Sequence, residues 1–387
     1  MRHPMRRVAI PLVVLSLFAA SCTTDDQGTG ANSPPASDAA SGSATTAVPA
    51  DTAAGSTAAD GTVEEVQVSG STLDAVQEAG VFRCGTRDDL PGFATLDAEG
   101  GYVGFDSDFC RVIAAAVLGD AEAVEMVSVA TDDRFTTLQS GEIDALVRNT
   151  TWTATRDGVE GSTFLQPTFY DGQGMMVASD SGFATLADMD GVIICVAQGT
   201  TTEGNAAAEA AKLGVEWEVR AFESVELIQA AFIAGQCDGW SSDTSQLSGV
   251  RSTYPDGPEA LTILPEIFSK EPLAPAVADG DTEWAQAVNW AILATITAEE
   301  LGITSENVDT FADTEDVNIQ RFLGLSVEDE AVLDPGLGLP ADFAFQVVSQ
   351  VGNYGEIFER HLAPLGLERG VNALWSDGGL MYSPPYR

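Results

Sequence analysis

The chain has 387 residues, of which 44% are hydrophobic, so it is long enough for one large or two ordinary domains. It carries 59 acidic against 17 basic residues, a formal net charge of −42, which argues against nucleic acid as a partner because such a chain repels phosphate backbones. The only histidines, His3 and His361, leave little imidazole for acid–base chemistry, which argues against most hydrolases and metalloenzymes but not against enzymes that use carboxylates alone.

Residues 1–21 have the pattern of a secretory signal peptide, with three arginines before the apolar run Val8 to Phe18 and small residues after it. Cys22 follows directly, as in a lipobox, although Ala19 stands where that motif usually has Leu. We therefore expect removal of residues 1–21 and lipidation of Cys22, which would anchor the protein to the membrane. The alternative is an ordinary signal peptide followed by an incidental cysteine.

Residues 22–70 begin with this cysteine and continue as a segment rich in Ala, Thr, Ser, Gly, Pro and Asp. From residue 23 to residue 69 the segment contains no aromatic residue, Lys or Arg. Such a composition cannot bury enough apolar area to offset the entropy lost on ordering. We predict a flexible tether that lifts the folded part, from residue 71 onward, off the membrane.

From Leu73 the chain alternates strand-like and helix-like patterns. A first series of strand, helix, strand, helix and strand is predicted at residues 81–86, 106–118, 124–129, 134–140 and 143–147. A second series begins near Met175 and continues in the same alternation at residues 192–196, 201–212, 217–222, 227–234 and 239–241. The pattern predicts α/β sheets with helices on both faces, arranged as two lobes with a cleft in which a small molecule binds beyond the strands' carboxyl ends.

Four cysteines remain beyond Cys22, and an even number in an exported protein suggests two disulfides. Three pairings are possible. We predict Cys84–Cys110 and Cys195–Cys237, because each bond then joins neighbours within one compact unit. The alternative is four buried thiols, and the spacing does not suit a metal site because no Cys-x-x-Cys pair occurs.

Polar stretches follow several predicted strands and contain both halves of a zwitterion-binding site. Arg156 ends a stretch dense in hydroxyl groups, and its guanidinium can hold a carboxylate through two parallel hydrogen bonds, although it could equally be a surface arginine. Thr200 and Thr201 open a helix whose free N–H groups suit an anion, with Thr200 and Glu203 at capping-box spacing. Asp243 could accept hydrogen bonds from an ammonium or merely cap the following helix.

The ordered set of motifs resembles the polar amino-acid-binding proteins of ABC importers, solute-binding protein family 3. The motifs that carry the resemblance are Gly85 to Phe93, Gly104-Phe105-Asp106, Gly141 to Asp144, Thr151/Thr153/Arg156, Gly199-Thr200-Thr201 and Gly235 to Asp243. Three longer runs, at residues 148–152, 351–360 and 367–385, resemble the general L-amino-acid and glutamate/glutamine/aspartate-binding subfamily.

This resemblance implies a type II periplasmic-binding-protein-like fold, with two α/β lobes that close on ligand like a hinge. We expect the first lobe at residues 71–172 plus 269–387 and the second at residues 173–268. The implied roles are Arg156 with Thr151 beside it on the ligand α-carboxylate, Thr201 from the second lobe, and Asp243 on the α-amino group.

The side-chain end of the predicted site is implied by differences from relatives that bind cationic ligands. Arg87 stands where those relatives hold an acid, and Leu90 stands where they often carry a stacking aromatic residue. Arg87 and Arg148 therefore favour an acidic or amide side chain, although Arg87 could instead pair with Asp88 or Asp89. The predicted ligand-binding residues are Arg87, Arg148, Asn149, Thr151, Arg156, Thr200, Thr201 and Asp243.

The expected function is capture of L-amino acids, with glutamate, aspartate and glutamine favoured, by a monomeric extracytoplasmic lipoprotein that delivers them to the membrane subunits of an ABC permease. The protein is expected to need no cofactor or metal and to catalyse no reaction. Two other functions are considered: a dehydratase of small carboxylic acids on the same scaffold, and a ligand-sensing domain. The dehydratase would need a placed acid and base, for which Asp243 is the only ready candidate.

Overall fold

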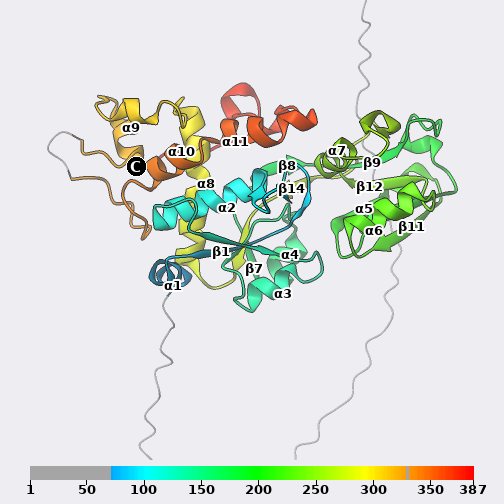
Figure 1. Ribbon diagram of the computed structural model, residues 1–387, viewed down its shortest axis with the longest axis horizontal. Coiled ribbons are helices and arrows are strands. Elements are labelled where there is room, and N and C mark those ends of the chain that lie inside the picture. The colour runs from blue at the N-terminus through cyan, green and yellow to red at the C-terminus, as the bar shows by residue number, and fades with distance from the viewer. Residues whose placement is uncertain (1–70, 328–330) are drawn as a thin grey trace, which may run out of the picture. The chain divides into compact units, whose positions relative to one another are not determined.

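The computed structural model describes residues 71–327 and 331–387 (Figure 1). The predicted signal peptide, the lipidation site Cys22 and the tether lie outside these described residues. Within the described residues, every helix is too short or too polar to cross a membrane.

Two five-stranded sheets organise the described chain and follow the same plan. Their strand orders are β5-β1-β6-β15-β7 and β11-β10-β12-β9-β13, and in each the first three strands are parallel and the fourth is antiparallel to them. The first sheet contains Phe82–Thr86 (β1), Val124–Ser128 (β5), Ala145–Leu146 (β6), Ser162–Phe164 (β7) and Ala276–Ala278 (β15). The second contains Gln173–Ala178 (β9), Val192–Ala197 (β10), Trp217–Phe222 (β11), Gly239–Asp243 (β12) and Leu261–Ile263 (β13).

Helices connect the strands and cover the sheets, which confirms the predicted α/β class. The α-helices are Thr72–Ala79 (α1), Phe105–Leu118 (α2), Arg134–Gln139 (α3), Ala154–Val159 (α4), Thr201–Leu213 (α5), Val225–Ile233 (α6), Thr244–Ser252 (α7), Thr282–Glu300 (α8), Val317–Phe322 (α9), Phe343–Gln350 (α10) and Tyr354–His361 (α11). Short 3-10 helices lie at Leu186–Asp188, Pro258–Ala260, Val308–Phe311, Ala363–Leu365, Gly370–Asn372 and Trp375–Asp377. A small sheet is formed by Asp89–Leu90 (β2), Ala94–Leu96 (β3) and Tyr102–Val103 (β4).

Most predicted elements begin and end within two residues of the observed ones. Helix α6 starts earlier than expected because Ser224 caps it by accepting a hydrogen bond from the Leu227 N–H (3.3 Å). The strand predicted at 143–147 is reduced to the two residues of β6.

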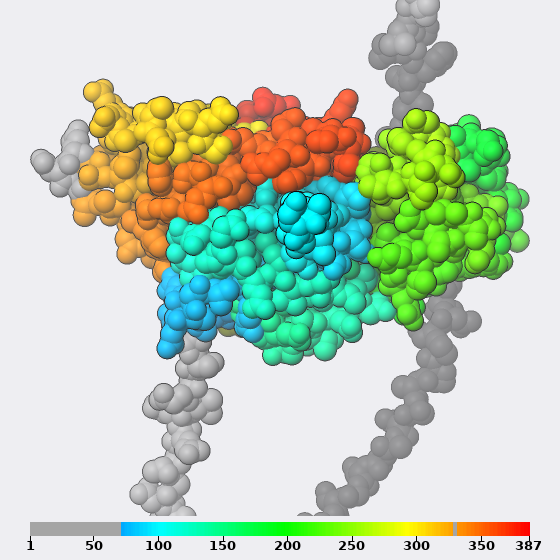
Figure 2. Space-filling view, viewed as in Figure 1, coloured from blue at the N-terminus to red at the C-terminus, as the bar shows by residue number. Residues whose placement is uncertain are grey.

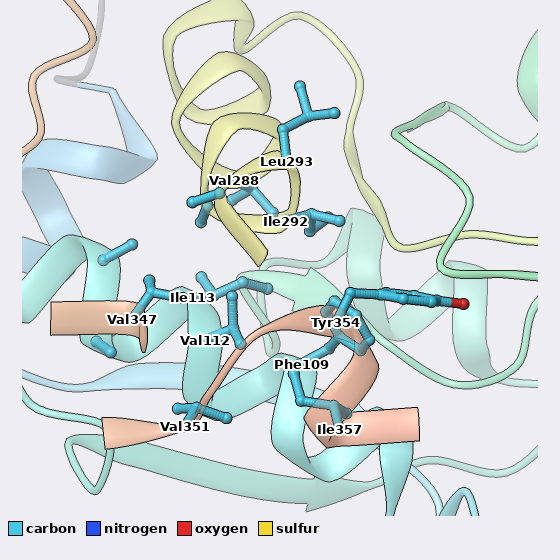
Figure 3. Close-up of a cluster of buried hydrophobic side chains, with 14 of the residues drawn as sticks. Phe109, Val112, Ile113, Val288, Ile292, Leu293, Val347, Val351, Tyr354 and Ile357 are labelled. Carbon is cyan, nitrogen blue, oxygen red and sulfur yellow. The ribbon is translucent and has the colours of Figure 1, made fainter. Parts of the chain in front are cut away.

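The main hydrophobic core surrounds α2, whose residues are nearly all buried and which is enclosed by helices from distant parts of the chain. Val112 and Ile113 of α2 face Val288 and Ile292 of α8, and Phe109 lies beside Tyr354 of α11 (Figure 3). Helices α10 and α11 pack against α2 and α8, so residues near both ends of the described chain share one core. On the surface, the orange segment near the C-terminus lies directly against the cyan segment near the N-terminus (Figure 2).

Both predicted disulfides are present. Cys84 in β1 is bonded to Cys110 in α2, and Cys195 in β10 is bonded to Cys237 in the loop before β12, with Cα separations of 5.9 and 5.8 Å. Each bond joins a strand of one of the two sheets to a helix or loop beside that sheet. In the chain-entropy account each stabilises the folded state by about 3–4 kcal/mol.

A two-stranded ribbon of Phe169–Asp171 (β8) and Glu271–Leu273 (β14) lies where the chain passes between the sheets. The Asn372 side chain holds this ribbon, because its amide accepts from the Tyr170 N–H (2.7 Å) and donates to the Tyr170 carbonyl (3.0 Å). The lobe boundaries at residues 172/173 and 268/269 adjoin the ribbon and remain our proposal.

Candidate functional site

A polar cavity of about 360 Å³ lies beyond the carboxyl ends of the parallel strands of both sheets, where ligands bind in folds of this kind. Its lining includes all the residues predicted from sequence to bind ligand: Arg87, Arg148, Asn149, Thr151, Arg156, Thr200, Thr201 and Asp243. These eight residues lie at or after the carboxyl ends of four strands, β1, β6, β10 and β12, and the full lining adds residues that follow β5 and β11. Their part in ligand binding stays a prediction.

The two walls of the cavity differ in charge. Four guanidinium groups line it, from Arg87, Arg134, Arg148 and Arg156, and all four follow strands of the first sheet. The residues that follow strands of the second sheet supply no cation to the lining, but they supply Glu223, Glu226 and Asp243 together with several hydroxyl groups. Asp88 and Asp89 also belong to the first wall, so its four arginines face two acids of their own. The first wall therefore keeps an excess of positive charge, and the second wall has acids and hydroxyls without a cation.

Arg156 is placed by the first turn of α4. The N-cap residue Thr153 accepts a hydrogen bond from the Arg156 N–H (3.2 Å), and the Arg156 guanidinium donates to the Thr151 carbonyl (2.8 Å). That bond uses one of five guanidinium N–H donors, which leaves others for a ligand. Burial lowers the pKa of Arg156, an effect opposed by the negative charges of Glu271 and Asp243.

Arg87 lines the cavity, and it also forms an ion pair with Asp89, which the sequence offered as the alternative to ligand binding. Its Nε donates to Asp89 (2.5 Å), and its Nη1 donates to the side-chain oxygens of Asn149 (3.1 Å) and Gln246 (3.5 Å). Asp88 is exposed. Gln246 belongs to α7, so this guanidinium contacts groups from the regions of both sheets.

Asn149 adopts a left-handed backbone conformation, with φ of 33°, which is uncommon outside glycine. The buried carboxylate of Asp106 accepts a hydrogen bond from the Asn149 N–H (2.7 Å) and so stabilises this turn. Burial raises the pKa of Asp106 to about 7, although this hydrogen bond and the charges of Arg87 and Arg148 act in the opposite direction.

Arg134 and Arg148 are buried cations held by neutral groups. Arg148 donates to the Val129 carbonyl (2.7 Å) and the Thr131 hydroxyl (2.9 Å), and Arg134 donates to the carbonyls of Thr131 and Gly199, the latter at 3.1 Å. Within residues 71–327 and 331–387 neither forms an ion pair with a carboxylate.

Burial and neighbouring cations lower the pKa of both groups, that of Arg134 to about 9. An anion in the cavity would reduce the electrostatic repulsion between these buried guanidinium groups. Sequence reasoning missed Arg134 because it reads as the first residue of an ordinary helix. Its position just after the carboxyl end of β5 was the available signal.

Asp243 ends β12 and precedes α7, and its side chain makes no capping hydrogen bond to this helix, whose residues the structure describes in full. Burial, and then the charges of Asp171 and Glu271, raise its pKa well above the ordinary value. A cation beside this carboxylate would stabilise its ionised form. The structure therefore speaks against the capping alternative.

The loop before α5 is shaped by Gly199, whose φ of 68° favours glycine, and a Cβ atom there would clash with the Asp132 side-chain oxygen and would displace it. Thr200 caps the helix as predicted, but its hydroxyl accepts from the Thr202 N–H (3.3 Å) rather than from Glu203, so the expected capping box is wrong. The same hydroxyl donates to the Ala197 carbonyl (2.7 Å), which fixes it in this orientation.

In the described part of the chain, no three His, Cys, Asp or Glu side chains lie close enough together to hold a metal ion. The cavity lining itself offers guanidinium, carboxylate, amide and hydroxyl groups. These groups can bind and orient a small charged molecule.

The fold and the cavity define an α/β protein that binds small polar molecules. Residues 82–306 match the bacterial extracellular solute-binding proteins, family 3, and the chain belongs to this family. The membership confirms the resemblance and the predicted class of binding protein, and it favours that class over the dehydratase alternative.

Two curated relatives cover most of the chain. The General L-amino acid-binding periplasmic protein AapJ of Rhizobium johnstonii is 45% identical over 82% of this chain and 94% of its own length. The Glutamate/glutamine/aspartate/asparagine-binding protein BztA of Rhodobacter capsulatus is 43% identical over 82% of this chain and 94% of its own length.

A solved structure shares the fold, which confirms the predicted type. It is an ABC transporter/periplasmic binding protein from Brucella ovis with glutathione bound. Its TM-score is 0.80 at 41% identity, and the match covers 82% of this chain and all of the other.

Proposed function

We propose that the protein captures L-amino acids, above all glutamate, aspartate and glutamine, outside the cytoplasm and delivers them to an ABC permease. The observation that carries the proposal is the division of charge across the cavity, with four arginines on one wall and Asp243 on the other. An α-amino acid has a carboxylate and an ammonium on one carbon and can pair with both walls at once. The names of the two curated relatives support the same ligand class.

The ligand orientation follows from the partners already present. Arg156 and Thr151 hold the α-carboxylate, and Asp243 accepts from the α-ammonium. Arg87, Arg148 and Arg134 then face the side chain, where an anion would reduce the repulsion among buried guanidinium groups. Thr200 and Asn149 complete the polar lining.

A second candidate ligand is a short γ-glutamyl peptide. The γ-glutamyl end of glutathione keeps a free α-carboxylate and α-ammonium, so it presents the same groups as glutamate. The cavity also extends to Ser224, Val225 and Glu226 at the start of α6, beyond the groups assigned to the amino-acid head. The glutathione-bound relative from Brucella ovis supports this candidate.

Titration calorimetry with L-glutamate, L-aspartate, L-glutamine, L-lysine and glutathione tests the proposal. We expect one ligand per chain, the strongest binding for the acidic and amide ligands, and recovery of each ligand unchanged, which separates a binding protein from a dehydratase. Tighter binding of L-lysine than of L-glutamate, or conversion of a ligand, would overturn it.

The lipid anchor on Cys22, the monomeric state and the hand-over to permease subunits are parts of the same proposal. The signal-peptide pattern and the cysteine after it support the anchor. The Cys22→Ala variant should be released from membranes while binding ligand normally. Retention of this variant on membranes would contradict the anchor and leave the ligand proposal standing.

A further inference from the structure

Glu271 is a buried carboxylate that lies outside the cavity lining and outside the predicted site. It is the first residue of β14 and is 2% exposed. Its oxygens accept hydrogen bonds from the Thr201 hydroxyl (2.9 Å), the Asn205 amide (2.7 Å) and the Ser269 hydroxyl (2.6 Å). Glu271 therefore joins the ribbon to the start of α5.

The direction of these bonds determines what Thr201 can offer to a ligand. An ionised carboxylate can only accept hydrogen bonds, and three donors around one carboxylate are what the ionised form requires. The single hydroxyl proton of Thr201 is then committed to Glu271. Since Thr201 lines the cavity, its side-chain oxygen has only lone pairs for a ligand and can accept but not donate.

Negative charge gathers on this side of the cavity. Glu271 is the β-ladder partner of Asp171, and the charges of both act on Asp243. A ligand group that carries positive charge and several N–H donors complements this arrangement. A ketone oxygen at the same place has no hydrogen to donate, so it could form no hydrogen bond with these acceptors, and it carries no positive charge.

We propose that Glu271 is a positioning residue that turns Thr201 into a hydrogen-bond acceptor and thereby makes the site select a protonated α-amino group over a keto group. The inference rests on the proposed function and deepens it. The resemblance implies only that Thr201 contributes from the second lobe, and in this inference its hydroxyl serves the ammonium. The Thr201 N–H, at the first position of α5, stays available to the carboxylate.

The test compares the affinities of L-glutamate and 2-oxoglutarate, which differ at the α-carbon alone. In Glu271→Gln the side-chain amide can donate to the Thr201 oxygen, which frees the hydroxyl proton to point at a ligand. We expect the preference for L-glutamate over 2-oxoglutarate to fall by roughly tenfold or more. Where 2-oxoglutarate binds too weakly for direct calorimetry, its displacement of glutamate gives the ratio.

Two further variants separate positioning from support of the fold. Thr201→Val should lower the same ratio. In the double variant, Glu271→Gln should cause little further decrease, because both changes remove the same acceptor, the Thr201 side-chain oxygen. Asn205 also donates to Glu271, but Asn205→Ala leaves Thr201 in place. The ratio of the L-glutamate and 2-oxoglutarate affinities of this variant should therefore stay within about twofold of the parent value. The thermal midpoint of each variant reports on folding separately.

Failure of this inference differs from failure of the proposed function. If the parent protein binds no amino acid, the proposed function is wrong. If the parent binds glutamate but Glu271→Gln weakens glutamate and 2-oxoglutarate by the same factor, or leaves both unchanged, the role of Glu271 is wrong and the amino-acid site remains.

Discussion

The two sheets share a plan but differ in the chemistry at their strand ends. In each, the second strand of the sheet, β1 or β10, lies between two parallel neighbours and carries a disulfide-bonded cysteine. Yet every arginine of the cavity follows a strand of the first sheet, whereas the second sheet provides Asp243 and the hydroxyl-rich start of α5. The backbone plan determines where a ligand lies, and the residue after each strand determines which of its groups is bound.

This difference has a consequence for ligand capture in our proposal. A zwitterion pairs fully when both walls are near it, so ligand should favour the state in which they are close together. Arg156→Ala and Arg87→Ala each remove one charge from the wall that follows the first sheet, whereas Asp106→Asn changes the buried carboxylate that holds Asn149.

The largest effect is expected for Arg156→Ala, which removes the predicted partner of the α-carboxylate that all amino acids share. Leaving a buried carboxylate without its cation costs roughly 3–5 kcal/mol, so calorimetry should detect no binding of any amino acid. Arg220→Ala is the control, because Arg220 pairs with Glu218 on an exposed part of β11. Unchanged glutamate affinity in Arg156→Ala would show that another arginine reads the carboxylate.

An intermediate and selective effect is expected for Arg87→Ala. Loss of a charged hydrogen bond should weaken glutamate and aspartate by about 1.5–3 kcal/mol. Glutamine should lose less, because its amide forms a neutral bond, and alanine should change little. Equal losses for glutamate, glutamine and alanine would instead assign Arg87 to the loop that it forms with Asp89 and Asn149.

The smallest effect on affinity is expected for Asp106→Asn, since the amide oxygen can still accept from the Asn149 N–H. The free energy of unfolding of the parent protein, however, should depend on pH through Asp106. The pKa of Asp106 is raised from 3.8 to about 7, so the folded protein keeps a proton that the unfolded chain has released. This group therefore makes the parent lose stability as pH rises from about 4 to about 7, with the loss complete above that window.

Urea unfolding at several pH values measures this contribution. The free energy of unfolding of Asp106→Asn, relative to the parent, should rise across the same window. A difference that does not vary with pH would mean that Asp106 titrates at its ordinary pKa.

Local sequence pattern predicted the elements well, because periodicity and helix caps are short-range signals. The strand at 217–222 agrees with β11, and the helix at 201–212 falls one residue short of α5. The predicted binding residues also line one cavity, since they lie at or after the carboxyl ends of parallel strands, which is where ligands bind in such folds.

Side-chain direction and distant pairing were beyond the reach of the sequence. Arg134 donates to Gly199, 65 residues away, and Thr201 donates to Glu271, 70 residues away. Nothing in a local pattern links such pairs. The hydroxyl of Thr200 shows the same limit, because the sequence did not reveal that it donates to the Ala197 carbonyl while accepting from the Thr202 N–H.

The division of the cavity into a carboxylate-reading wall and an ammonium-reading wall is tested most directly by calorimetry with three ligands. L-Glutamate has both head groups, glutarate lacks the ammonium, and 4-aminobutyrate lacks the α-carboxylate. We expect glutamate to bind and each of the others to lose roughly a hundredfold or more in affinity, because one wall is left without its partner. Glutarate that binds as tightly as glutamate would contradict the assignment of the second wall, and with it the account of this protein as an amino-acid receptor.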